Sequence, residues 1–430
     1  MVATAIKANN NKVAPPQLPL ELLTFDSALE SIAKWFPPRS ADVDWWWQVM
    51  GSHLQTMLSA GGYTISEQSE ALLFFYHWVA PRMGPKPTSS EAEWKSFMTD
   101  DYSPVEYSWK WGFGDDAPEI RYSIEPIGHF AGTARDPLNQ QATCDFLTQL
   151  QRSGLRGLSL EWFDHFKHAL LGPGSPASKV TETSQSTLFL AFEHGDGPIG
   201  AKAYFVPVDA PNNSSSSQIS RAIATAGCPN LVAINELNSF LQNDVHGRSI
   251  KPFMLGIDCV SPAESRLKIY SRSPVTTFDF VRHVMSFGGQ RTGLEEAEQQ
   301  LHQLWKMVLG LPDDFPTDKP LNFKSHETAG VLFYFDVAPK SALPDVKVYI
   351  PVHHYAPSDE VTANGLVKFL NDHGRGAYTQ QYSEMLKDVA TPEGMSKSNG
   401  VHTWVTCAYK KGKLVITSYL NPQYYHPSRF

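Results

Sequence analysis

Charged and apolar residues alternate along several short segments of this chain. In residues 264–271, ESRLKIYS, the side chains of Arg266, Lys268 and Tyr270 stand at every second position with apolar residues between them. Because successive side chains of a β-strand point to opposite faces, one face of this strand would have two cations and a phenol, and the other would be apolar. A single strand of this kind usually buries its apolar face and leaves its cations in water.

The same alternation recurs in four other segments. Arg121 lies in EIRYSIEPIG, Lys202 and Tyr204 in GAKAYFVP, Lys347 and Tyr349 in VKVYIPVHH, and Lys413 and Tyr419 in GKLVITSYLNP. The cations follow one another at similar intervals, and helix-like sequence separates successive pairs of strand-like segments. This spacing predicts a diverged repeat of helix, helix, strand and strand, in about five copies.

The periodicity of apolar residues between these strands supports that organisation. It predicts helices over residues 41–60, 66–82, 139–152, 216–244, 276–287, 293–309, 360–373 and 379–388. Residues 1–19 are polar and contain prolines, so they are predicted to form a flexible tail. No linker divides the remainder, and residues 20–430 are predicted to form one domain.

Five cationic strands with apolar opposite faces can share a single arrangement. If helices cover the apolar faces, the Lys, Arg and Tyr side chains point inward. A closed barrel of about ten antiparallel strands, surrounded by a ring of helices, has this property, since closure leaves no exposed strand edge and a barrel of this width encloses a lumen. The predicted fold class is therefore α+β, a barrel built from repeated ααββ units.

Composition and charge narrow the function classes. The 430 residues are 42% hydrophobic and 19% charged, with a formal net charge of −8, which argues against a nucleic-acid partner because phosphate binding needs a basic face. The four cysteines, Cys144, Cys228, Cys259 and Cys407, form no CxxC pair and suggest neither a zinc cage nor a disulfide framework. Without a signal peptide or a run of about 18 apolar residues, the protein is predicted to be soluble and cytoplasmic, with no membrane partner.

Cations that converge in a lumen predict a particular chemistry. A buried cation without a counter-charge is expensive, so several of them predict a multiply charged anion, and diphosphate fits both the Arg fork and the Lys point charge. The neighbouring tyrosines need another reason. Each ring face attracts a cation by up to about 2 kcal/mol when desolvated, so a ring of them would shield a carbocation. Ionisation of an allylic diphosphate is the reaction that needs both features.

An electron-rich ring must then capture the allyl cation and lose a proton. A carboxylate that binds an indole N–H or a phenol O–H would raise the nucleophilicity of that ring. Glu106 in SPVEYSWKWG is the candidate, because it lies among Tyr107, Trp109 and Trp111 on a strand-like segment. The alternative interpretation is a carboxylate at the rim of an edge strand.

The chain resembles a known family, the fungal dimethylallyltryptophan synthase-type aromatic prenyltransferases, whose fold is the ABBA barrel. The resemblance extends from about residue 40 to residue 425. It rests on the ordered motifs SPVEYSWKWG, IRYSIEPIG, AKAYFVP, CVSPAESRLKIY, KVYIPVHH and SYLNP.

The resemblance implies roles for individual residues. Glu106 would contact the aromatic acceptor. Leu332, together with Trp109, which is close to Glu106 in the sequence, is expected to line the acceptor site. The residues expected to bind diphosphate are Arg121, Lys202, Arg266, Lys268, Lys347 and Lys413, although Lys410 and Lys411 are alternatives to Lys413. The residues expected to shield the carbocation are Tyr204, Tyr270, Tyr349 and Tyr419.

Two positions limit what the resemblance implies about substrates. Members that act at C4 of tryptophan have a basic lysine on the strand before AKAYF, whereas STLFLAFEH has none, so C4 alkylation of free tryptophan is not expected. The position resembling a donor-length gate falls at Leu332, whose intermediate size favours a C5 donor without excluding C10. The segment SFMTDDYSPVEYSWKWG resembles the branches of this family that act on polycyclic phenols or elaborated indoles.

The histidine-containing segments do not predict a metal site. Glu161, His165 and His168 have helical metal-ligand spacing, but the same segment is equally an amphipathic helix with apolar residues inward. His353 and His354 are expected to point to opposite faces of one strand, so that at most one enters the lumen. The resemblance likewise implies that no metal and no cofactor is required.

The predicted function is transfer of a dimethylallyl group from dimethylallyl diphosphate to an indole derivative or a polycyclic phenol, by Friedel-Crafts-type alkylation in fungal secondary metabolism. The partners expected are these two small molecules, with a monomer or a homodimer as the assembly. The alternative is a non-catalytic barrel that binds a phosphorylated or aromatic metabolite.

Overall fold

The computed structural model describes residues 27–180, 186–193, 199–227, 232–410 and 412–430, so the predicted tail lies outside the described residues. Its strands form a closed antiparallel barrel in the order β1-β10-β9-β8-β7-β6-β5-β4-β3-β2. They are β1 (Val105–Lys110), β2 (Glu119–Ile124), β3 (Leu188–Glu193), β4 (Gly200–Phe205), β5 (Lys251–Asp258), β6 (Leu267–Ser273), β7 (Val331–Val337), β8 (Asp345–Ile350), β9 (His402–Lys410) and β10 (Lys413–Leu420). The predicted barrel is therefore confirmed.

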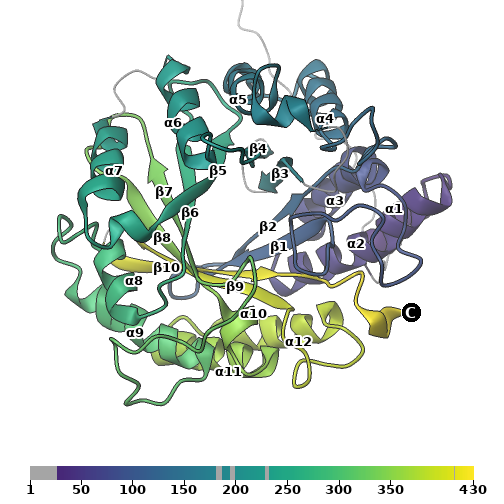
Figure 1. Ribbon diagram of the computed structural model, residues 1–430. Coiled ribbons are helices and arrows are strands. Elements are labelled where there is room, and N and C mark those ends of the chain that lie inside the picture. Colours follow the sequence, from purple (N-terminus) through teal and green to yellow (C-terminus); the bar gives the residue numbers. More distant parts are fainter. Residues whose placement is uncertain (1–26, 181–185, 194–198, 228–231, 411) are drawn as a thin grey trace, which may run out of the picture.

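Helices surround the barrel on its outer side (Figure 1). They are α1 (Ala28–Ala33), α2 (Ala41–Ala60), α3 (Ile65–Phe74), α4 (Gln141–Arg152), α5 (Glu161–Leu171), α6 (Ser215–Thr225), α7 (Val232–Asn243), α8 (Phe278–Met285), α9 (Glu295–Leu309), α10 (Val352–Tyr355), α11 (Asp359–Asp372) and α12 (Thr379–Val389). Pairs of helices alternate with pairs of strands, as the repeat predicted. In the described parts of the chain, no helix combines the length and apolar character needed to cross a membrane.

Local sequence explains where several helices begin and end. α3 begins with a capping box, in which the Thr64 side chain accepts from the Glu67 backbone and the Glu67 side chain accepts from the Thr64 backbone. The single helix predicted over 216–244 is instead α6 and α7. Gly227 has a φ of 63°, and a left-handed glycine just beyond the last turn ends α6.

Alternation along each strand separates the two faces of the barrel. Residues on the outer face join one large apolar cluster with the helices, and those on the inner face form a second, smaller cluster that includes Tyr204, Tyr270 and Tyr349. The apolar face of each cationic strand is therefore the face that packs on helices, and the polar face lines the lumen.

Glu125 is a buried anchor just beyond β2. Its carboxylate accepts hydrogen bonds from Trp94 Nε1 at 2.8 Å, Ser96 Oγ at 2.5 Å, Asn139 Nδ2 at 2.9 Å and Ser186 Oγ at 2.6 Å. Burial raises the pKa of this carboxyl, and the four donors oppose that rise. The contacts tie the segment before β1 to the segments that follow β2 and precede β3.

Replacing Glu125 by alanine is expected to lower the free energy of unfolding by about 3–5 kcal/mol, because each buried donor left without an acceptor costs about 1–3 kcal/mol. Chemical denaturation measures this change. Glu296→Ala, on the exposed surface of α9, serves as the control and should shift stability by no more than about 0.5 kcal/mol. A loss below about 1 kcal/mol for Glu125→Ala would show that the surrounding donors find other acceptors.

Candidate active site in the barrel cavity

The lumen holds a cavity of about 480 Å³. Because inward side chains recur at every second position, neighbouring strands contribute to successive layers of its wall. Each of the strands β4, β6 and β8 has a lysine and, two positions later, a tyrosine. These pairs are Lys202 and Tyr204, Lys268 and Tyr270, and Lys347 and Tyr349. A charged layer therefore adjoins a tyrosine layer, and the strand ends beyond the tyrosines carry Glu106.

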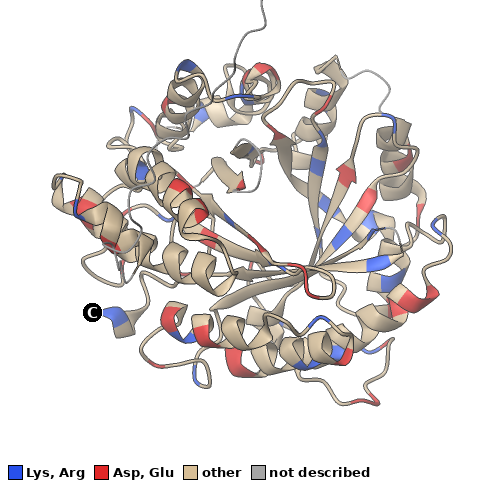
Figure 2. Ribbon diagram, turned by 180° about the vertical axis from the view of Figure 1, so that it is seen from behind, with Lys and Arg blue, Asp and Glu red and all other residues tan. Residues whose placement is uncertain are grey.

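The charged layer contains the predicted cations Arg121, Lys202, Arg266, Lys268 and Lys347 together with carboxylates. Charged residues lie on the barrel strands as well as on the helices (Figure 2). Arg121 Nε lies 2.6 Å from Glu119 Oε1, and its Nη1 lies 3.1 Å from Glu193 Oε1. Glu193 also pairs with Lys202, and Glu119 accepts from Lys110 Nζ at 2.8 Å. The cations Arg121 and Lys110 hold the pKa of Glu119 at about 2 although burial opposes this.

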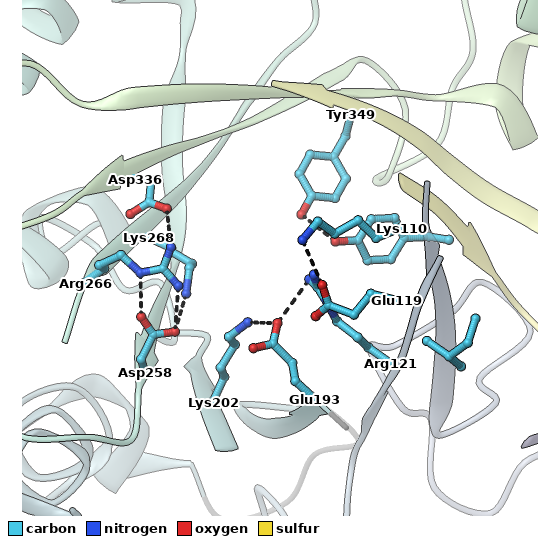
Figure 3. A network of polar contacts seen from close by, with 12 residues as sticks. Lys110, Glu119, Arg121, Glu193, Lys202, Asp258, Arg266, Lys268, Asp336 and Tyr349 are labelled. Carbon is cyan, nitrogen blue, oxygen red and sulfur yellow. Dashed lines mark hydrogen bonds and ion pairs between the residues drawn. The ribbon is translucent and has the colours of Figure 1, made fainter. Parts of the chain in front are cut away.

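A second group of ion pairs lies beside the first, on the strands that follow β4 (Figure 3). The Asp258 carboxylate accepts hydrogen bonds from Arg266 Nε at 2.7 Å and from Lys268 Nζ at 2.6 Å. Arg266 Nη1 donates to Asp336 Oδ2 at 3.1 Å. Against the effect of burial, Lys268 and Arg266 keep the pKa of Asp258 well below its usual range. These contacts hold the side chains of Arg266 and Lys268 in fixed positions.

The expectation that the cations lack counter-charges is wrong. Glu193, Asp258 and Asp336 lie at or near the ends of β3, β5 and β7, and Glu119 begins β2, so all four carboxylates face the cations of adjacent strands. A buried cation is tolerated when it is paired and hydrogen-bonded. The layer nevertheless has more cations than carboxylates.

Lys347 is the exception in this layer. Its side chain is buried, its Nζ lies 5.4 Å from the centre of the Tyr334 ring, and no carboxylate of the described residues forms an ion pair with it. Burial, followed by the charges of Arg121 and Lys410, lowers the pKa of Lys347 to about 7. Burial and Lys268 similarly lower the pKa of Lys202 to about 8, even beside Glu193.

The tyrosine layer is formed by rings that touch one another around the lumen. Ring centroids are 5.9 Å apart for Tyr204 and Tyr270, 6.0 Å for Tyr270 and Tyr349, and 5.5 Å for Tyr349 and Tyr419. Tyr334, which the sequence reasoning missed, lies 5.2 Å from Tyr270. Burial raises the pKa of each of these phenols, so the rings remain neutral.

Glu106 lines the opposite end of the cavity from the charged layer. Thr403 Oγ1 donates to its Oε1 at 2.6 Å. Burial raises the pKa of Glu106 to about 8, and the nearby Asp100 adds to the rise while Thr403 opposes it. β1 pairs with both β10 and β2, so the alternative of a rim carboxylate on an edge strand does not hold.

One of the two residues predicted to line the acceptor site lies elsewhere. Trp109 points to the outer face of β1, where its ring is 5.3 Å from that of Tyr382 on α12, so it does not line the acceptor end of the cavity. It stands three positions after Glu106, and an odd step reverses the face of a strand. Leu332, in contrast, lines the cavity.

The lysines of the last hairpin also differ from the prediction. Lys413 is exposed, with its Nζ 5.1 Å from the centre of the Phe113 ring. Lys410, which is also exposed, lies opposite it on β9, and its charge adds to the effects of burial and of Arg121 that lower the pKa of Lys347. Lys411 lies outside the described residues. Lys410 is therefore the better candidate for an additional cation of the charged layer.

The expected arrangement of two adjacent histidines is also wrong. β8 ends at Ile350, and after Pro351 the chain forms α10 instead of continuing as a strand. A proline cannot donate to the ladder, which favours the end of the strand at this position. The rings of His353 and His354 consequently lie side by side, with centroids 3.8 Å apart, and both line the cavity near Asp100.

The chain is similar to several known proteins. Residues 42–385 match the model of a family described as tryptophan dimethylallyltransferase. The chain is 37% identical over 427 residues to prenyltransferase anuH of Penicillium roqueforti, with 94% of each chain covered. It is 33% identical to xanthone prenyltransferase A of Emericella nidulans, covering 92% of this chain and 95% of that protein.

A solved structure supports the fold independently. The crystal structure of AnaPT from Neosartorya fischeri aligns with a TM-score of 0.75 and 23% sequence identity, over 92% of this chain and 98% of that one. At this level of identity the match concerns the arrangement of helices and strands.

Proposed function

Because this chain belongs to the tryptophan dimethylallyltransferase family of aromatic prenyltransferases, we propose that it transfers a dimethylallyl group from dimethylallyl diphosphate to a hydroxylated aromatic small molecule. The observation that carries this proposal is the presence of the three layers in one lumen. Arg121 and Lys202 of the charged layer, the neutral rings of the tyrosine layer and the carboxylate of Glu106 all line the same cavity.

The charged layer suits the diphosphate of the donor. Lys202, Arg266, Lys268 and Arg121 are held in place by carboxylates before the donor arrives, so little side-chain entropy is lost on binding. When the allylic C–O bond breaks, its electron pair leaves with the diphosphate. Cations fixed around the leaving group stabilise the charge that develops there.

The tyrosine layer suits the carbocation that remains. Neutral ring faces attract the allyl cation without offering it a nucleophilic anion. The rings also fill the wall where water would otherwise capture the cation. The ring of the acceptor supplies the electron pair for the new carbon–carbon bond, and the resulting arenium ion then loses a proton from the alkylated carbon.

Glu106 suits the acceptor hydroxyl. Its carboxylate can accept the O–H of a phenol, which increases electron density in the ring, and it can take up the proton once the ring is alkylated. Thr403 fixes the rotamer of Glu106 by its 2.6 Å hydrogen bond.

The acceptor class follows from what the wall lacks. The inner face of β3 presents Phe189, Ala191 and Glu193, and the strand contains no lysine that could serve as a base beside free tryptophan. The relative from Emericella nidulans is named for xanthones, which are polycyclic phenols when hydroxylated. We therefore propose a phenolic acceptor, with no metal in the chemical step.

Incubation with dimethylallyl diphosphate, EDTA and separate panels of hydroxylated aromatics and indoles tests the proposal. We expect diphosphate release together with a mass gain of one prenyl unit on a phenolic acceptor, and no C4-prenylated tryptophan. Donor binding without transfer to any member of either panel would instead support the carrier alternative.

Donor binding is expected to take up a proton at Lys347, because the diphosphate stabilises its ammonium form. Lys347 is charged in the empty barrel only below its pKa of about 7, so donor affinity should fall as the pH rises above this value, by up to about tenfold per pH unit. Calorimetry in buffers of different ionisation enthalpy measures the proton.

The control is Lys347→Met. This variant cannot take up a proton at position 347, whereas the phosphates of the donor still ionise as they do with the wild type. The difference between wild type and variant isolates the lysine. The same pH dependence in both proteins would contradict the assignment.

A further inference from the structure

Four side chains that the prenyl-transfer mechanism does not use converge at the end of the cavity near Glu106. Asp100 precedes β1, His326 precedes β7, and His353 and His354 follow β8. Among the described residues, Asp100, His326 and His354 form the group whose ligand atoms all lie within 4.8 Å of one another.

The distances around Asp100 resemble the edges of a coordination tetrahedron. Its Oδ2 lies 3.0 Å from His353 Nε2, 3.8 Å from His354 Nε2 and 4.0 Å from His326 Nδ1. Ligand atoms bonded to one Zn²⁺ in a tetrahedral site are about 3.3 Å apart. Small side-chain rotations would therefore bring the ligand atoms of Asp100, His326 and His354 to coordination distance, whereas His353 is not in this group.

The hydrogen bonds of the cluster leave lone pairs facing one another. His353 Nδ1 lies 2.7 Å from the Thr403 carbonyl oxygen and its Nε2 lies 3.0 Å from Asp100 Oδ2, and because both oxygens accept, His353 donates to each and orients the Asp100 carboxylate. The Thr328 backbone N–H donates to His326 Nδ1 at 3.2 Å, so that nitrogen is unprotonated. An unprotonated imidazole nitrogen of His326, the Nε2 of His354 and a carboxylate thus meet in one place.

The Thr328 hydroxyl lies at the centre of this group. Its Oγ1 is 2.7 Å from His354 Nε2, 2.8 Å from His326 Nδ1 and 3.1 Å from Asp100 Oδ1. A hydroxyl has one proton to donate, so it cannot satisfy all of the acceptors around it. A divalent cation at this position would satisfy them together.

We propose that Asp100, His326 and His354 bind one transition-metal ion such as Zn²⁺, with a water molecule as the fourth ligand, His353 orienting Asp100, and the Thr328 hydroxyl rotating away as the ion enters. Imidazole nitrogens with one carboxylate suit Zn²⁺ and Co²⁺ better than Mg²⁺ or Ca²⁺, which prefer oxygen ligands. The ion would lie at the acceptor end of the cavity, outside the charged layer that receives the diphosphate, so its binding can be measured without any substrate.

Titration of the protein with Co²⁺, after removal of any polyhistidine tag, tests this inference without any substrate. We expect one bound ion with the visible absorption of four-coordinate Co²⁺, displaced by Zn²⁺. His354→Ala and His326→Ala should each weaken binding by more than about 100-fold, since even the loss of an outer-shell partner costs about 10–100-fold. The metal should raise the melting temperature of wild type and not that of these variants.

Two further variants sharpen the result. His168→Ala, an exposed histidine on α5, should leave Co²⁺ binding unchanged. Thr328→Ala clears the centre of the cluster and should retain or strengthen binding. Unchanged donor affinity in each variant shows that it is folded. Equal Co²⁺ affinity in wild type and His354→Ala, or the absence of a four-coordinate spectrum, would overturn the proposal.

Discussion

Replacing Glu106 by glutamine is expected to lower kcat by about 10²–10⁴-fold, because the amide keeps the shape of the side chain but cannot take up the proton of the alkylated acceptor. The affinity for the donor should stay within about twofold, since the charged layer lies at the other end of the cavity. Steady-state kinetics measure the first quantity. Calorimetry with a non-ionising thiolodiphosphate analogue of the donor measures the second.

The pH profile distinguishes this role from a purely structural one. With a pKa of about 8, Glu106 is mostly protonated at neutral pH, so kcat/KM for the acceptor should rise with pH up to about 8 in wild type and lose this rise in Glu106→Gln. Glu296→Gln on α9 is the matched control and should behave as wild type. An equal loss of donor affinity and of turnover in Glu106→Gln would refute the separation of roles.

Replacing Lys202 by alanine is expected to produce the complementary result. Loss of one buried cation from the charged layer should weaken donor binding by about 2–4 kcal/mol, roughly 30–1000-fold. Glu193 keeps its contact with Arg121 at 3.1 Å, so the variant should still fold. The donor dissociation constant and kcat at saturating donor are the quantities to compare.

Lys368→Ala is the matched control for Lys202→Ala. This lysine is exposed on α11 and pairs only with Asp372 of the same helix, so donor binding should not change. If Lys202→Ala binds the donor as tightly as Lys368→Ala does, Lys202 is not part of the diphosphate site.

The barrel could be predicted from the sequence because two independent periods agree. Alternation over two residues identifies the strands, and the recurrence of Lys-x-Tyr identifies the repeat, so the lumen follows once helices are assigned to the apolar faces. The same alternation assigns Trp109 to the outer face. Trp109 was predicted to line the acceptor site because it is close to Glu106 in the sequence. The structure shows that the odd number of positions between them puts the two side chains on opposite faces of β1.

Other parts of the site have weaker signals in the sequence. Glu193, Asp258 and Asp336 each end or nearly end an apolar strand, and this position could have identified them as partners of the cations. Asp100 and His326, however, come from connecting segments without any period, whereas Thr403 lies on β9. Closure of the barrel brings them together, and no local pattern encodes that proximity.

The layered wall has an evolutionary consequence. The donor end is formed by residues within the hydrogen-bonded ladders, where a change of register would reverse every side chain of a strand. The opposite end also draws on connecting segments such as that of Asp100, where insertions and substitutions are tolerated. A lineage with this barrel can therefore acquire new aromatic substrates by remodelling connections at one rim, while its ionisation chemistry is inherited intact.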